Sequence, residues 1–141
     1  MATLAMPRTT TRFGGLQLAI SVLVGLTALV HLAIGAFTNV IVATDPARAA
    51  SMGGATALNV MAALFYLCGL GYLVLTVALY LPALRRWRRL TRTALIVFTA
   101  GTILAYVALA YGHIDAFGLA DKACEAALIT LLVVEGRRVR S

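Results

Sequence analysis

The chain has 141 residues, of which 62% are hydrophobic and only 12% are charged, and its mean hydropathy is +0.95. Soluble domains contain about 45–50% apolar and about 25% charged residues, so this composition excludes an ordinary soluble domain and predicts one integral membrane domain over residues 1–141. The net charge of +7 comes from arginines clustered between apolar stretches, which argues against a nucleic-acid partner because such a partner requires a basic face on a soluble fold.

Four apolar stretches follow one another along the chain, and each can form a transmembrane helix, which needs about 20 residues. They cover residues 16–42, 56–81, 93–111 and 116–135. Pro82 ends the second stretch, and Gly136 followed by arginines ends the fourth. The sequence therefore predicts an all-α, four-helix transmembrane bundle. In helix count and size the chain resembles small four-helix bacterial membrane proteins, the DoxX-like group among them, and this resemblance covers the architecture alone.

The first stretch carries His31 on a face of small and polar residues that includes Thr27, Gly35 and Thr38. Such a face suits close helix packing, with the imidazole turned into the bundle. The connection that follows begins with Asp45-Pro46 and ends with two glycines, a pattern typical of a helix N-cap, first turn and C-terminal stop. We therefore expect a short interfacial helix in this first outer loop.

The second and third stretches offer Asn59 and Tyr106, both candidates for a ligand or proton site, although hydrogen-bonded packing is favoured over a catalytic role for both. The third stretch is followed by His113. Between these two stretches, arginines alternate with a tryptophan, a composition that suits anionic lipid headgroups and an aromatic interface anchor at the inner membrane face. The predicted headgroup contacts are Arg85, Arg86, Trp87, Arg88 and Arg89.

The basic residues also predict the orientation. Of the twelve lysines and arginines, all except Arg48 and Lys122 lie near the N-terminus, in the 82–92 loop or near the C-terminus. By the positive-inside rule these three regions are cytoplasmic. The sequence thus predicts a multi-pass protein of the cell membrane with both termini inside.

The fourth stretch contains a charged turn near its start, formed by Asp121, Lys122 and Glu125. Each charge costs roughly 2.5–3.5 kcal/mol at the centre of a bilayer, so such groups usually face the bundle interior. At helical spacing one lysine can bridge both acids. Counting residues along the helices places His31 at a similar depth, and we expect it to interact with Glu125. The turn is either a self-neutralising structural cluster or a site for a proton, an ion or a small ligand.

The function is less constrained than the fold. His31 and His113 could together bind haem if their depths match, whereas no short ligand spacing predicts a metal site. Motifs of hydrolases, phosphate-binding loops and metalloproteases are absent, which favours a non-enzymatic protein. We therefore expect an accessory or structural subunit of a larger membrane complex, or a homo-oligomer. The alternative is a protein that binds or transports a proton, an ion, a small ligand or a cofactor at the polar cluster.

Overall fold

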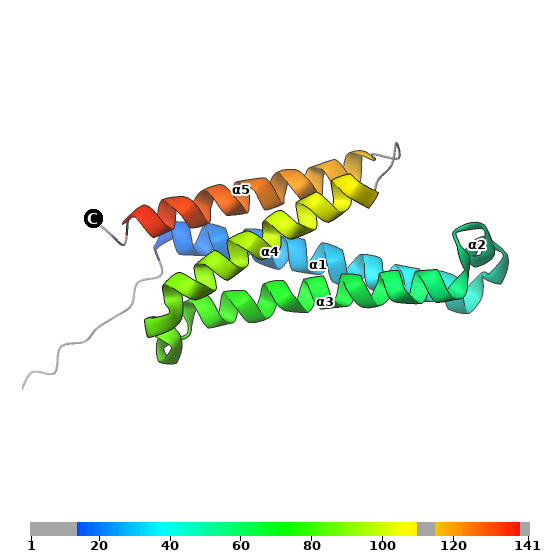
Figure 1. Cartoon of the computed structure of the whole chain (residues 1–141), viewed down its shortest axis with the longest axis horizontal. Coiled ribbons are helices and arrows are strands. Elements are labelled where there is room, and N and C mark those ends of the chain that lie inside the picture. Colours follow the sequence, from blue (N-terminus) through cyan, green and yellow to red (C-terminus); the bar gives the residue numbers. More distant parts are fainter. Residues whose placement is uncertain (1–13, 110–114, 139–141) are drawn as a thin grey trace, which may run out of the picture.

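The computed structural model describes residues 14–109 and 115–138, and each element within these ranges is a helix (Figure 1). In chain order the elements are α1 (Gly15–Thr44), α2 (Pro46–Ser51), α3 (Gly54–Tyr80), the 3-10 helix η1 (Pro82–Trp87), α4 (Arg88–Leu109) and α5 (Ala116–Arg138). The predicted all-α class is confirmed. Helix α4 begins earlier than the predicted residue 93, because the arginine-rich loop is itself helical.

Within the described residues, three helical segments are long and apolar enough to cross a membrane: α1, α3, and the continuous segment Pro82–Leu109 formed by η1 and α4. Helix α5 is set apart by its charges, since every stretch of 18 residues within it contains at least three charged side chains. The structure therefore supports a helical membrane protein with three candidate spans. The place of α5 in the membrane is taken up under the proposed function.

Helices α1 and α3 form a long antiparallel pair, and α2 connects them at one end (Figure 1). At this connection Asp45 caps α2 by accepting a hydrogen bond of 3.0 Å from the Arg48 N–H, and Pro46 opens the helix. Gly53 and Gly54 then adopt φ angles of 103° and 87°, a left-handed conformation that residues with a Cβ rarely adopt. The predicted short helix is thus present, with the predicted cap.

Close approach of α1 and α3 depends on Gly69. A Cβ atom at this position would lie 2.7 Å from the side chain of Leu32 and 3.0 Å from the carbonyl oxygen of Ala28. Contacts this short do not occur between real side chains, so the helices can approach this closely only where one of them lacks a side chain. This tight pair is the frame against which the other two long helices pack.

Helices α4 and α5 close the bundle into a ring, because α4 packs against α3, α5 packs against α1, and α4 and α5 pack against each other. The start of α1, η1 and the end of α5 lie at one end of the molecule, and α2 lies at the other (Figure 1). The apolar core lies toward the first of these ends and contains fully buried side chains from all four helices, among them Ile20, Tyr72, Leu95, Leu128 and Leu132.

Candidate functional site

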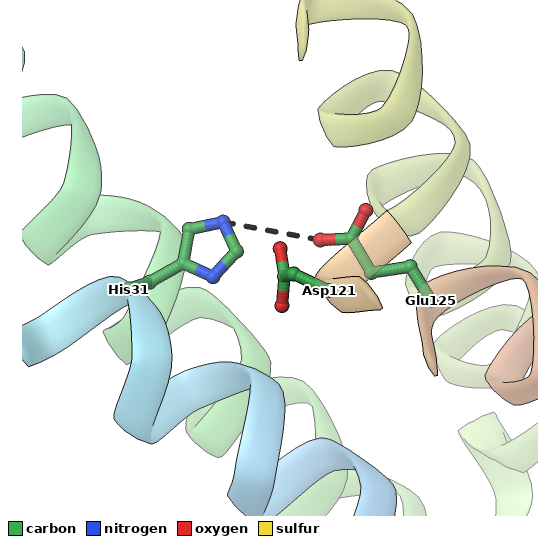
Figure 2. A group of neighbouring side chains, drawn as sticks. All are labelled: His31, Asp121 and Glu125. Carbon is green, nitrogen blue, oxygen red and sulfur yellow. Dashed lines mark ion pairs between the residues drawn. The ribbon is translucent and has the colours of Figure 1, made fainter. Parts of the chain in front are cut away.

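A group of buried and partly buried polar side chains lies where the four long helices face one another. We call it the central cluster, and its members are His31 from α1, Tyr72 from α3, Thr102 from α4, and Asp121, Lys122 and Glu125 from α5. Figure 2 shows three of them, with the His31 ring directed across the bundle toward the two carboxylates on α5.

Glu125 is the centre of this cluster and has no solvent exposure (0%). Its Oε1 atom lies 2.8 Å from the Lys122 ammonium and accepts a hydrogen bond of 3.0 Å from the Tyr72 hydroxyl. The same ammonium lies 2.9 Å from Oδ2 of Asp121. The predicted bridging of both acids by one lysine is therefore confirmed, and Tyr72 adds a donor from a third helix. The Tyr72 hydroxyl also shares a hydrogen bond of 2.9 Å with Thr102 on α4.

His31 is buried beside Glu125, and its Nε2 atom lies 3.8 Å from Glu125 Oε1 (Figure 2). The predicted approach of these two residues is thus confirmed. Its other ring nitrogen, Nδ1, lies 2.9 Å from the backbone carbonyl oxygen of Thr27. Because a carbonyl oxygen can only accept, Nδ1 carries the hydrogen, and in the neutral ring Nε2 directs its lone pair toward the carboxylate. The Nε2 lone pair then faces an oxygen of the Glu125 carboxylate, and a cation between the two atoms would stabilise this arrangement.

Aromatic rings hold the imidazole in this orientation. Its centroid lies 5.8 Å from that of Phe65 and 5.7 Å from that of Tyr72, both at tilted angles. Tyr72 is fixed in turn by an edge-to-face contact with Phe98, at 5.0 Å. Contacts of this kind stabilise aromatic side chains in one arrangement, so Nε2 is pre-positioned toward α5.

Two carboxylates of the cluster, those of Asp121 and Glu125, share one ammonium in a region of low dielectric. Oε2 of Glu125 is buried and has no hydrogen-bond partner among the residues that the structure describes. This oxygen and the Nε2 lone pair are the two groups that a further cation would satisfy.

Three possible metal ligands meet at this point. One ligand atom each from His31, Asp121 and Glu125 lie within 4.8 Å of one another. An imidazole nitrogen with two carboxylate oxygens is a donor set that zinc and other divalent transition metals accept. The hydrogen bond from Nδ1 to a backbone carbonyl is also the usual support of a metal-binding histidine. Chemically, the arrangement can hold a cation, and the Lys122 ammonium lies against the same carboxylates that a metal ion would use.

The remaining candidates from the sequence lie at different distances from the cluster. The Tyr106 ring contacts Lys122, with its centroid 5.7 Å from the ammonium, and its buried hydroxyl has no hydrogen-bond partner within the described ranges. Asn59 is exposed and lies about 20 Å along α3 from Tyr72, so the structure does not bring it to the cluster. His113, the second proposed haem ligand, lies outside the described residues.

Sequence reasoning missed a second buried ionic group, at the arginine-rich end. Glu135 on α5 accepts hydrogen bonds of 2.8 Å from Arg88 and 3.1 Å from Arg92, and both Glu135 and Arg92 are buried. Arg88 is therefore partly engaged within the bundle, whereas Arg85, Arg86, Trp87 and Arg89 are exposed, as lipid contact would require. The missed signal was the position of Glu135, three residues after Leu132 and hence next to it on the inward side of α5.

Comparison with protein-family models, with curated proteins and with solved structures finds no match for this chain.

Proposed function

We propose that the protein is a four-span protein of the cell membrane, with α5 as the fourth span. A helix of 23 residues is about 35 Å long, enough to cross the hydrocarbon core of about 30 Å. Its charged side chains Asp121, Lys122 and Glu125 pair with one another against α1 and α3. This internal pairing supports insertion despite the charges, which lipid exposure would not allow.

In this proposal both ends of the chain and η1 are cytoplasmic and α2 lies on the outer surface. The arginine-rich ends of the helices lie together (Figure 1), which satisfies the positive-inside rule for an even number of spans. The exposed arginines of η1 and Trp87 contact anionic lipid headgroups. Fusion of a fluorescent protein that folds only in the cytoplasm to the C-terminus tests this topology, since fluorescence supports four spans and its absence supports three.

We further propose that the protein binds a divalent transition-metal ion within its membrane domain, with His31, Asp121 and Glu125 as ligands. The observation that carries this proposal is the convergence of one donor atom from each of these residues to within 4.8 Å, from two helices, α1 and α5, that are far apart in the sequence. The orientation of His31 by the Thr27 carbonyl supports it, because it leaves Nε2 available to a ligand.

Charge balance supports a divalent ion in exchange for Lys122. A divalent ion brings two positive charges to the two carboxylates, whereas the ammonium brings one. The Lys122 side chain is 13% exposed, so its long stem can carry the ammonium outward when the metal enters. In this proposal the Lys122 ammonium occupies the metal position when no metal ion is bound.

Metal binding to the purified full-length protein in detergent tests the proposal. Co²⁺ is the probe, because ligation by protein side chains gives it a visible absorption spectrum, and Zn²⁺ competes for the same site. We expect one Co²⁺ per chain in the wild type and a loss of at least tenfold in affinity for His31→Ala and for Glu125→Gln.

The matched control is Glu135→Gln, which removes a second buried glutamate from the same helix, one that pairs with Arg88 and Arg92. If Glu135→Gln weakens Co²⁺ binding as much as Glu125→Gln, or if His31→Ala leaves it unchanged, the metal site is refuted. A wild-type protein that binds neither Co²⁺ nor Zn²⁺ refutes it as well.

A second candidate function, favoured by a different observation, is that of an accessory subunit or a self-associating protein. Gly25 on α1 and Gly101 on α4 have open space where a side chain would stand, so neither supports packing within the chain. Glycines on an outer helix face allow close approach of another transmembrane helix. Native mass spectrometry of the protein extracted from its source membrane tests this, because a stoichiometric partner or a dimer supports it and a monomer with lipid alone contradicts it.

A further inference from the structure

Two adjoining hollows lie at the arginine-rich end of the bundle, away from the central cluster. The first has a volume of about 320 Å³ and is lined by Arg85, Arg86, Arg88, Arg89 and Arg92. The second, of about 230 Å³, runs between α4 and α5 and is lined by Arg89, Arg92, Thr93, Ile96, Leu132, Val133, Gly136 and Arg137. Since Arg89 and Arg92 border both, the two hollows form one continuous surface that is basic at one end and apolar at the other.

At the basic end, the arginines outnumber the carboxylates that pair with them. Within the described residues these arginines have one carboxylate partner, Glu135, which is shared between Arg88 and Arg92. Arg92 is only 8% exposed, yet its Nη2 atom is buried without a hydrogen-bond partner in the described ranges, as is Nε of Arg88. Guanidinium groups bind phosphate and carboxylate oxygens strongly, so this end of the surface favours an anion.

Apolar side chains continue the surface along the two helices. Ile96 on α4 and Val133 on α5 border the second hollow just beyond the arginines, and Val133 is 39% exposed. A free anion would use only the arginines and leave this groove uncovered. A molecule with a phosphate at one end and an acyl chain at the other matches both parts.

We propose that the groove between α4 and α5 binds an anionic phospholipid, with its phosphate on Arg89, Arg92 and Arg137 and an acyl chain along Ile96 and Val133. The arginines lie at the end of the helices and the apolar groove lies inward from them, so the order of the two parts agrees with that of a headgroup and its tail at a membrane surface. This lipid site is independent of the proposed metal site, which uses none of these residues.

Native mass spectrometry of the full-length protein, titrated in detergent with phosphatidylglycerol or with phosphatidylcholine, tests the proposal. Two variants address the two parts of the site: Arg137→Gln removes a headgroup contact, and Val133→Trp fills the acyl groove without a change of charge. Arg48→Gln is the matched control, since Arg48 is exposed like Arg137 but lies on α2, at the opposite end of the molecule.

The wild type is expected to retain phosphatidylglycerol in preference to phosphatidylcholine. Arg137→Gln should lower this retention about fivefold, which corresponds to about 1 kcal/mol per basic residue at a lipid surface. Val133→Trp should lower it by a similar factor, and Arg48→Gln should leave it unchanged.

Two other results would overturn the proposal. Equal losses in Arg137→Gln and Arg48→Gln would indicate general electrostatic attraction rather than a site. A loss in Arg137→Gln with no loss in Val133→Trp, together with displacement of the lipid by inorganic phosphate, would indicate an anion site that does not use the groove.

Discussion

Replacement of Lys122 by methionine tests two effects of the ammonium: its contribution to the stability of the fold and its competition with a metal ion for the central cluster. The side chain keeps its length and apolar stem, but the ammonium between Asp121 and Glu125 is lost. We expect the variant to unfold more easily without metal and to bind metal more tightly than the wild type. Both effects have one physical cause, which is the repulsion between two carboxylates that have lost their shared counter-ion.

The distances give the size of both effects. The ammonium lies 2.8 and 2.9 Å from the two carboxylates, where each Coulomb attraction is about 6 kcal/mol at an effective dielectric constant near 20. Desolvation offsets much of this, and loss of one partner from a buried pair typically costs about 3–5 kcal/mol. At the lower end, a loss of about 3 kcal/mol lowers the unfolding midpoint of a chain of this size by about 10 °C.

A metal ion should restore most of this loss. Without competition from the ammonium, we expect the affinity for Zn²⁺ to rise at least tenfold, or about 1.4 kcal/mol. At a Zn²⁺ concentration about 100 times the dissociation constant of the variant, binding contributes about 2.7 kcal/mol. The unfolding midpoint of Lys122→Met should therefore return nearly to that of the metal-free wild type.

Thermal unfolding in detergent, followed by circular dichroism with and without Zn²⁺, measures both effects. Arg48→Met is the control, because it removes an exposed cation far from the cluster and should change neither stability nor affinity. If Lys122→Met binds Zn²⁺ no more tightly than the wild type, the ammonium does not occupy the place of the metal, and the exchange of one for the other is refuted.

Three further substitutions should destabilise the fold by amounts that follow from single contacts. Tyr72→Phe removes the hydrogen bond to Glu125 and should cost about 1.5–3 kcal/mol, measured by denaturant unfolding in mixed micelles. Gly118→Ala places a methyl group against the Tyr106 ring and should cost about 1–3 kcal/mol in the same assay. Gly69→Ala should cost a similar amount of about 1–3 kcal/mol, because its methyl group would lie 2.7 Å from the Leu32 side chain on α1. Crosslinking between cysteines introduced into α1 and α3 should slow in this variant.

Each of these substitutions has a control of the same chemistry. Tyr66→Phe removes a hydroxyl that accepts only an exposed hydrogen bond from Asn39, and it should change stability by less than about 0.5 kcal/mol. Gly25→Ala and Gly101→Ala add a methyl group in open space and should stabilise the helices by up to about 1 kcal/mol. If the controls lose as much stability as the test variants, the specific contacts are not the cause.

The polar faces of α1 and α5 could be predicted from the sequence because their chemistry is uneven around the helix. On α1, the face of Thr27, His31 and Thr38 is buried as predicted, and on α5 the face that contains Asp121 and Glu125 turns inward. A charged side chain in an apolar helix is stable only where it faces the bundle interior. Its position in the sequence therefore shows which face of the helix turns inward. The depth of each residue then sufficed to pair His31 with Glu125.

Helix α3 could not be oriented in the same way. The sequence offers Asn59 as the candidate polar site residue of this helix, but the buried residues are Leu58, Ala62, Gly69, Tyr72 and Leu79, about one residue away around the helix. Nearly all side chains of α3 are apolar, so their pattern favours no single face. The true inward face is fixed by Gly69, whose contact with α1 depends on backbone separation, and this cannot be recognised before the helices are paired. For this reason Tyr72, the donor to Glu125, was missed.

The surroundings of the central cluster determine from which side a cation can reach it. Toward the arginine-rich end the fully buried Leu95, Leu128 and Leu132 separate it from Glu135, and a charged species would lose its hydration among them. On the opposite side, Asp121 and Lys122 retain 9% and 13% exposure of their side chains. A metal ion at the proposed site would therefore enter, and the ammonium would leave, toward the Ala116 end of α5. This arrangement suits reversible binding from one face, and a continuous path across the membrane would first require the leucines to separate.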